Sequence, residues 1–228
     1  MFAKVPAEFL QKFVVAVETY CRPLSRKTFS DSPEVRSITN TNLRDIRQRW
    51  MPRRDQQSWI HEIAVDIIAL WSCGPAFLAA MMDVAENSEP FLVDSPHPPY
   101  ALRLKMLALC AENLGWQKEA QSLVELESQW ASVQTVKSHN RYLTLCPAEL
   151  VQAALSWALE ACREWSIPKC TRAQLRSFTD RRQKNCPIDS ANELIGSAWL
   201  IFESNPRAYP EWEARTVRCL RDELNGDS

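Results

Sequence analysis

Apolar side chains recur every three or four residues along most of this chain, which is the spacing of an amphipathic helix. A clear example is the segment 6–21, with one apolar side formed by Phe9, Leu10, Phe13, Val14 and Val17. Alternating patterns typical of strands are almost absent, and with only 4 glycines the composition also favours helix. The sequence therefore predicts an all-α multi-helix bundle of eight to ten helices with no significant sheet.

Prolines and glycines divide this pattern into separate helices. Pro23 is expected to break the first helix, and Gly74-Pro75 to end one long helix and open the next, since proline suits the first helical position. Gly115 is expected to stop another helix. The predicted helices span residues 6–21, 33–50 with a possible break at 40–42, 56–73, 75–86, 100–113, 117–138 with a break after Trp130, 148–166, 171–183, 188–203 and 210–224.

The best candidate for a domain boundary is the polar stretch Thr135 to Thr144, although the composition shifts sharply nowhere. It would divide a helical domain, 1–134, from a C-terminal helical extension, 135–228, packed on it. His139 in this stretch is expected to lie in a solvated turn. No fixed-period repeat is present, so a helical solenoid is not predicted.

Charge and cysteine usage bound the protein's surroundings. The net charge of −1 gives no overall attraction to nucleic acid or to an anionic membrane, and no apolar run reaches the roughly 18–20 residues that span a bilayer. The 8 cysteines form no C-x-x-C pair. Because the N-terminus does not read as a signal peptide, free buried thiols in a reducing cytoplasm are expected.

Two stretches are locally basic, Arg44 to Arg54 and Lys169 to Lys184. The first also holds Trp50, so it could contact phosphate with an interleaved aromatic ring. Acidic residues are mixed into both stretches, which favours a solvated or ion-paired face instead. A nucleic-acid partner is therefore not expected, and the predicted partner is a protein. Most of the tryptophans fall at positions typical of a helical core.

The candidate chemistry starts with two acids at the beginning of a very apolar helix. Glu62 and Asp66 are spaced i, i+4, so they lie on one helix face. An unpaired carboxylate is costly to bury, so each needs a metal or a basic partner. His61 points about 100° away from Glu62 and is not expected to join it on one ion.

About 45 residues around these acids resemble the gluzincin zinc peptidases, the group that includes the CAAX prenyl protease and its bacterial relatives. Glu62-Ile-Ala-Val-Asp66 is similar to the Glu-x-x-x-Asp element of that family, and His97-Pro98 with Arg103 to its later His-Pro and Arg element. The resemblance implies that Glu62 is a zinc ligand and that Asp66 orients a ligand histidine. It places His97 and Arg103 beside the cleft.

The HExxH element of the family, with two zinc-binding histidines and a general-base glutamate, is absent. None of the three histidines are spaced i, i+4; they are His61, His97 and His139. One upstream segment can be aligned with HExxH if Ala7 and Gln11 replace both histidines, which would leave Glu8 at the general-base position. Because catalytic zinc needs three protein ligands plus water, zinc is expected only if the site is completed elsewhere.

Three functions therefore stay open. The chain can be a catalytically inactive zincin-like helical protein that acts as a binding or regulatory module. It can be a fragment or subunit of an active zinc peptidase whose HExxH segment is missing from this chain. It can also be a helical interaction protein unrelated to peptidases. As the chain stands, it is not expected to be an enzyme.

Overall fold

A computed structural model describes residues 7–27, 33–51, 58–133, 136–176 and 191–225. These residues form ten helices with defined bounds, and residues 172–176 form a further short helix. This part of the chain contains no strand. The all-α prediction is therefore confirmed, and the number of helices is one above the predicted range of eight to ten.

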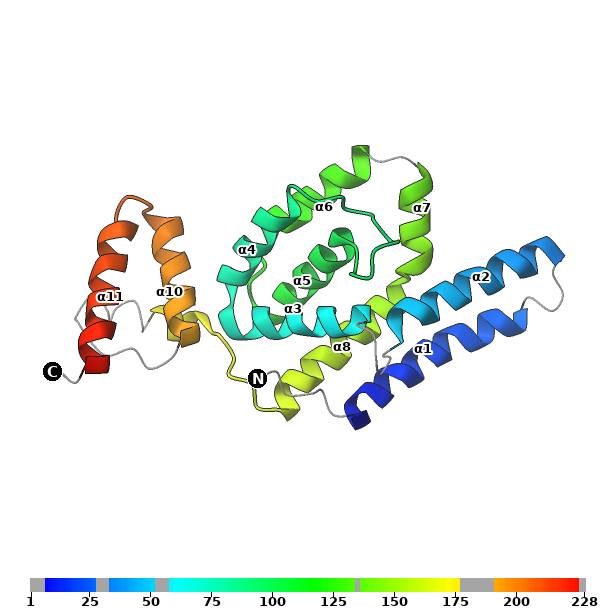
Figure 1. Cartoon of the computed structure of the whole chain (residues 1–228), viewed down its shortest axis with the longest axis horizontal. Coiled ribbons are helices and arrows are strands. Elements are labelled where there is room, and N and C mark those ends of the chain that lie inside the picture. The colour runs from blue at the N-terminus through cyan, green and yellow to red at the C-terminus, as the bar shows by residue number, and fades with distance from the viewer. Residues whose placement is uncertain (1–6, 28–32, 52–57, 134–135, 177–190, 226–228) are drawn as a thin grey trace.

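The central helix is α3 (Trp59–Cys73), which crosses the middle of the molecule (Figure 1). It packs against α4 (Pro75–Ala85), α5 (Tyr100–Leu114) and α8 (Ala148–Glu164). Eight of its side chains are buried, and they lie on more than one side of the helix. A helix that is apolar nearly all round is stable only when neighbours cover it, which explains its central position.

The first two helices, α1 (Ala7–Lys27) and α2 (Pro33–Trp50), run side by side at one end of the molecule (Figure 1). The predicted break at Pro23 is wrong, because α1 continues through that residue. Pro23 and Thr19, whose carbonyl it frees, both lie on the exposed side of α1, where water can bind that carbonyl. The possible break at residues 40–42 is also not present, since α2 is continuous.

The predicted polar boundary at residues 135–144 is mostly helix. After α6 (Gln121–Val133), residues Val136–Leu145 form α7. This mostly polar helix can still pack on the core, because Tyr142 and Leu145 are buried one helical turn apart. The buried core continues from α1 through α8, and α8 packs on α1 and α3. The division into 1–134 and 135–228 stays a prediction.

His139 lies on α7 and not in a solvated turn, so that prediction was wrong. Its ring meets the edge of Phe91 at 5.0 Å between centroids, and Phe91 also contacts Tyr142 at 5.1 Å. These contacts fix the segment between α4 and α5 against α7. The aromatic contact was not predictable, because Phe91 is distant from His139 in the sequence.

Two glycines end helices as predicted. Gly74 ends α3 at φ +60° and Pro75 opens α4, while Gly115 ends α5 at φ +85° in the left-handed region. A Cβ atom on Gly74 would lie 2.7 Å from the Sγ atom of Cys170. The turn between α3 and α4 therefore needs glycine for its backbone angle and for space.

The last two helices, α10 (Ala191–Ser204) and α11 (Tyr209–Asn225), form a pair at the other end of the molecule (Figure 1). α10 packs on α4 and α3, which connects this pair to the central helix. Aromatic contacts hold the pair together, with the ring centroids of Phe202 and Tyr209 5.6 Å apart.

Core composition and thiol state agree with the sequence. In the described ranges seven cysteines have free thiols, five of them buried. Most tryptophans are core residues as predicted; those that are buried are Trp50, Trp59, Trp71, Trp116, Trp157 and Trp212. A search of the same ranges finds no helix with both the length and the apolar character needed to cross a bilayer.

Candidate functional site

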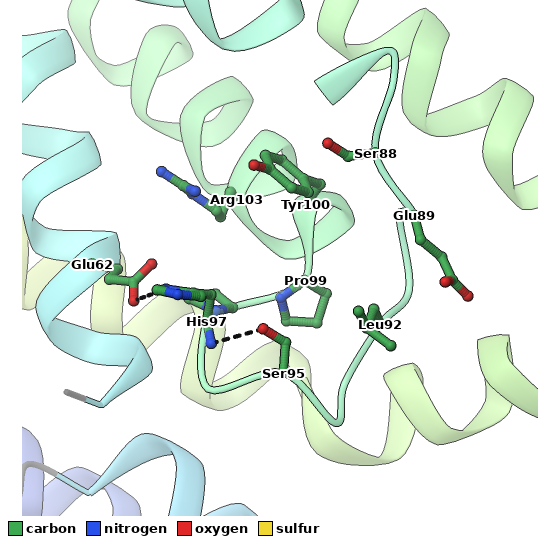
Figure 2. Close-up of a pocket in the computed structure, with 10 residues that line it drawn as sticks. Glu62, Ser88, Glu89, Leu92, Ser95, His97, Pro99, Tyr100 and Arg103 are labelled. Atoms are coloured by element: carbon green, nitrogen blue, oxygen red, sulfur yellow. Dashed lines mark hydrogen bonds and ion pairs between the residues drawn. The ribbon is translucent and has the colours of Figure 1, made fainter. Parts of the chain in front are cut away.

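A cavity of about 470 Å³ lies beside the first half of α3 (Figure 2). The segment 86–99, which connects α4 to α5, and the first turn of α5 form its other walls. Four of its lining residues can be charged, namely Glu62, Glu89, His97 and Arg103. The cavity therefore brings together two parts of the chain that are distant in sequence, α3 and residues 86–103.

Glu62 and His97 are directly bonded across this cavity. The Oε1 atom of Glu62 lies 2.6 Å from the Nδ1 atom of His97, as the dashed line in Figure 2 shows. The Glu62 side chain is 17% exposed and that of His97 is 59% exposed. The histidine thus covers one oxygen of an acid that is only partly open to water.

Asp66, one helical turn further along α3, is held by Arg103 of α5. The Nε and Nη2 atoms of Arg103 each donate a hydrogen bond of 2.7 Å, one to each carboxylate oxygen. Burial raises the pKa of Asp66, and the hydrogen bonds and charge of Arg103 oppose that rise. Such a two-point contact is the geometry in which a guanidinium stabilises a buried carboxylate best.

The segment that carries His97 is fixed from outside the cavity. Arg49 of α2 donates from Nη1 to the backbone oxygen of Ser95 at 3.0 Å and from Nη2 to Asp94 at 3.3 Å. Arg141 of α7 bonds the other Asp94 oxygen at 2.5 Å. On the inside, the Ser95 hydroxyl accepts the backbone N–H of His97 at 3.1 Å. The wall is therefore formed before any ligand arrives.

These contacts account for part of the basic stretch 44–54. Arg49 anchors the segment 86–99, and Arg47 binds Glu18 of α1 with two hydrogen bonds, of 3.0 and 3.2 Å. Trp50 is fully buried, and its indole N–H donates to Leu145. In this stretch the aromatic ring is not available for stacking on a base, and these two arginines are already paired.

The four residues of the zinc-peptidase resemblance thus lie together, two on α3 and two at or after the 86–99 segment. Glu62 contacts His97, and Asp66 contacts Arg103. The side chain of Glu8 lies outside the described residues. His61 does not line the cavity; its Nδ1 atom lies 3.0 Å from the Ser58 hydroxyl, and burial lowers its pKa.

The side chains at this site do not fit a zinc ion. A catalytic zinc takes three protein ligands, and the described residues contain no group of three His, Cys, Asp or Glu side chains that could hold a metal. Glu62 and His97 are two potential ligands in contact with each other. The guanidinium of Arg103, bound to the neighbouring Asp66, adds a positive charge that disfavours a second cation at that acid.

Sequence reasoning missed the rest of the lining. Glu89 and Leu92 are exposed residues of an irregular segment, and Tyr100 opens α5 beneath the Arg103 guanidinium, 5.4 Å from it. Their position before a helix that carries Arg103 is the one signal that could have placed them near Glu62. No periodicity marks such residues, because the segment has no regular structure.

Comparisons of this chain with models of known protein families, with curated proteins and with solved structures found no match.

Proposed function

We propose that this chain is a binding protein without hydrolytic activity, built on a helical scaffold similar to that of the gluzincin peptidases. Its site is the cavity beside α3, and its partner is a protein. The observation that carries the proposal is the pairing of both acids with bases of the same chain. Glu62 is bonded to His97 and Asp66 to Arg103, so neither acid is held as an isolated ligand for a metal.

The lining of the cavity supports binding as the remaining role. Ligand sites combine a concave surface, apolar walls and a few oriented polar groups, in volumes of roughly 300–1,000 Å³. The cavity beside α3 has about 470 Å³ and contains Leu92 and Pro98 as well as charged groups. A reducing compartment such as the cytoplasm suits this protein, because the seven thiols of the described part are free.

Zinc content and peptide hydrolysis test the proposal together. The full chain is incubated with zinc chloride, dialysed and analysed for metal, and the same sample is assayed on a mixture of unstructured peptides. We expect much less than one zinc per chain and no hydrolysis above the zinc-only blank. Glu62→Gln should change neither value.

The opposite result has a defined meaning. One zinc per chain, lost in Glu62→Gln together with zinc-dependent hydrolysis, would overturn the proposal. It would favour the alternative in which this chain is part of an active zinc peptidase. A second variant, Glu86→Gln, controls for the loss of one surface charge, because Glu86 is exposed and does not line the cavity.

A further inference from the structure

We propose that the cavity beside α3 binds an organic cation, the ammonium or guanidinium group of a lysine or arginine side chain that a partner protein inserts. This ligand class rests on the function proposed above, which takes the cavity as the binding site. Charge, shape and rigidity of the lining each favour it.

The cavity wall carries net negative charge. Glu62 and Glu89 line the cavity, and the third acid, Asp66, is paired with the lining residue Arg103. These three carboxylates and one guanidinium leave two net negative charges, and the lining stays negative even if His97 is protonated. A cation is attracted to such a wall and an anion is repelled, so complementarity selects a positively charged group.

The charge of the arginine in the wall is already balanced by an acid, which weakens it as an anion site. Arg103 uses Nε and Nη2 for the two bonds to Asp66, and Nη2 also lies 3.9 Å from the Met81 sulfur. One face of its guanidinium covers the ring of Tyr100. A carboxylate or phosphate approaching Arg103 would therefore meet a paired cation and the nearby charge of Glu62.

The acids, in contrast, keep acceptor atoms for a ligand. Within the described residues, Glu62 accepts at Oε1 from His97 and has no hydrogen bond at Oε2. Glu89 is exposed and makes neither an ion pair nor a hydrogen bond with a described side chain. Figure 2 shows these two acids on opposite sides of Pro99. In this view the Glu89 carboxylate is directed away from Glu62. A positively charged head group at the Oε2 atom of Glu62 therefore gains a contact that the free protein lacks, and Glu89 adds negative charge to the rim.

The apolar part of the lining distinguishes an organic cation from a metal ion. Leu92 is 45% exposed at the cavity, and Pro98 and Pro99 line it as well. Lysine and arginine carry an aliphatic stem that packs on such surface while the head group reaches polar atoms. A metal ion gains nothing from these walls and needs several converging ligands, which the described residues do not provide.

The wall is also fixed in place, which lowers the cost of ordering on binding. Arg49 and Arg141 hold Asp94, and Arg49 holds the backbone of Ser95. Prolines at 98 and 99 restrict the backbone where the segment enters α5. Glu62 on α3 and the segment from Asp94 to Pro99 therefore present a fixed wall to the ligand.

The test uses blocked amino acids as probes, so that only the side chain differs. Nα-acetyl-lysine methylamide and Nα-acetyl-arginine methylamide are titrated into the full chain, with the norleucine and glutamate analogues as uncharged and anionic controls. The methyl resonances of Leu92 report binding by NMR. We expect saturable shifts for the two cationic probes, with a Kd on the order of 1–10 mM, as for small fragments. The norleucine and glutamate analogues should produce no saturable shift.

Variants then assign the site. Glu89→Gln and Glu62→Gln should each raise the Kd of the lysine probe about three- to fivefold, the effect of losing one partly exposed charge pair. Glu86→Gln is the matched control on the same segment and should leave the Kd unchanged. Spermidine is included as a free polyamine, and it should not bind tenfold more tightly than the amino-acid probes.

Each other outcome overturns the proposal. Equal binding of the norleucine analogue would make the cavity a purely apolar site, and preferential binding of the glutamate analogue would make it an anion site. Both results would be compatible with the proposed binding function but would exclude a cationic ligand.

Spermidine at a tenfold lower Kd would assign the site to a free polyamine. The absence of saturable shifts for every probe, or an equal effect of Glu86→Gln, would remove the site. Zinc-dependent hydrolysis would overturn the proposed function independently of these titrations.

Discussion

Removing Arg103 should lower the free energy of unfolding of this protein, by an amount that depends on pH. The guanidinium joins α5 to α3 through two hydrogen bonds of 2.7 Å to Asp66. The side chains of Asp66 and Arg103 are only 5% and 19% exposed. In Arg103→Met the carboxylate stays buried without its partner, which is the situation in which breaking an ion pair costs most.

The size of the effect follows from the burial. Deleting one partner of a buried pair costs about 3–5 kcal/mol, and the partial exposure of Arg103 places our expectation near the lower value. For a domain of this size, about 3 kcal/mol corresponds to a melting temperature lower by roughly 6–12 °C. Urea unfolding followed by circular dichroism measures the free energy of unfolding directly.

The pH dependence is the sharper part of this prediction. Burial raises the pKa of Asp66, and Arg103 opposes that rise, so the folded-state pKa climbs further when Arg103 is removed. An acid whose folded-state pKa exceeds its unfolded value binds more protons when folded, so stability falls as pH rises between the two values. The stability difference between Arg103→Met and the wild type should therefore shrink on going from pH 8 to pH 5. The difference in unfolding free energy between the two proteins should change by at most about 1.4 kcal/mol per pH unit.

A second arginine pair supplies the matched control. Arg47 binds Glu18 with the same two-point geometry, but both side chains are 36% exposed. Arg47→Met should cost no more than about 1 kcal/mol and add no pH dependence. Equal losses in the two variants, or a loss in Arg103→Met that is the same at pH 5 and pH 8, would refute the argument from burial. Adding Asp66→Asn to Arg103→Met should abolish the added pH dependence.

Two further predictions concern the α3–α4 turn and the buried thiols. Gly74→Ala should lower the free energy of unfolding by roughly 3 kcal/mol, because the backbone angle disfavours a side chain and Cys170 blocks it. In Gly115→Ala the added Cβ atom meets nothing within 4 Å, so this change should cost about 1 kcal/mol. Equal losses for the two variants in urea unfolding would show that the contact with Cys170 does not matter. Burial raises the pKa of Cys110 to about 12, so a thiol reagent at pH 8 should label Cys73 before Cys110. Peptide mapping by mass spectrometry checks that order, and rapid labelling of Cys110 in the folded protein would contradict it.

The helical pattern was readable because apolar side chains repeat at helical spacing, and the turn at Gly74-Pro75 because two residue types mark it. The errors arose where tertiary contacts overrode local signals. Pro23 by itself predicts a break, but its helix is held on the buried side by Val17 and Cys21. The polar composition of residues 135–144 predicts a boundary, because sequence alone does not show that Tyr142 and His139 meet Phe91.

The candidate site was predictable only in part, for the same reason. The need of Glu62 and Asp66 for partners follows from the cost of burying a carboxylate, so the existence of basic partners or a metal was foreseeable. Which base meets which acid was not, since it depends on how α5 and the 86–99 segment cross α3. No periodicity marks Glu89 or Arg49 as site residues, because their roles come from the path of an irregular segment.

The two acids of α3 lie one helical turn apart, but one stabilises the fold and the other lines the cavity. Glu62 and Asp66 share a face of the helix, yet the side chain of the first is 17% exposed and that of the second only 5%. Asp66 is therefore committed to Arg103 and to the packing of α5 on α3, whereas Glu62 retains an oxygen toward the cavity. It follows that a charge-removing change at Asp66 tests the stability of the fold. The same change at Glu62 tests the site while the α3–α5 ion pair stays intact.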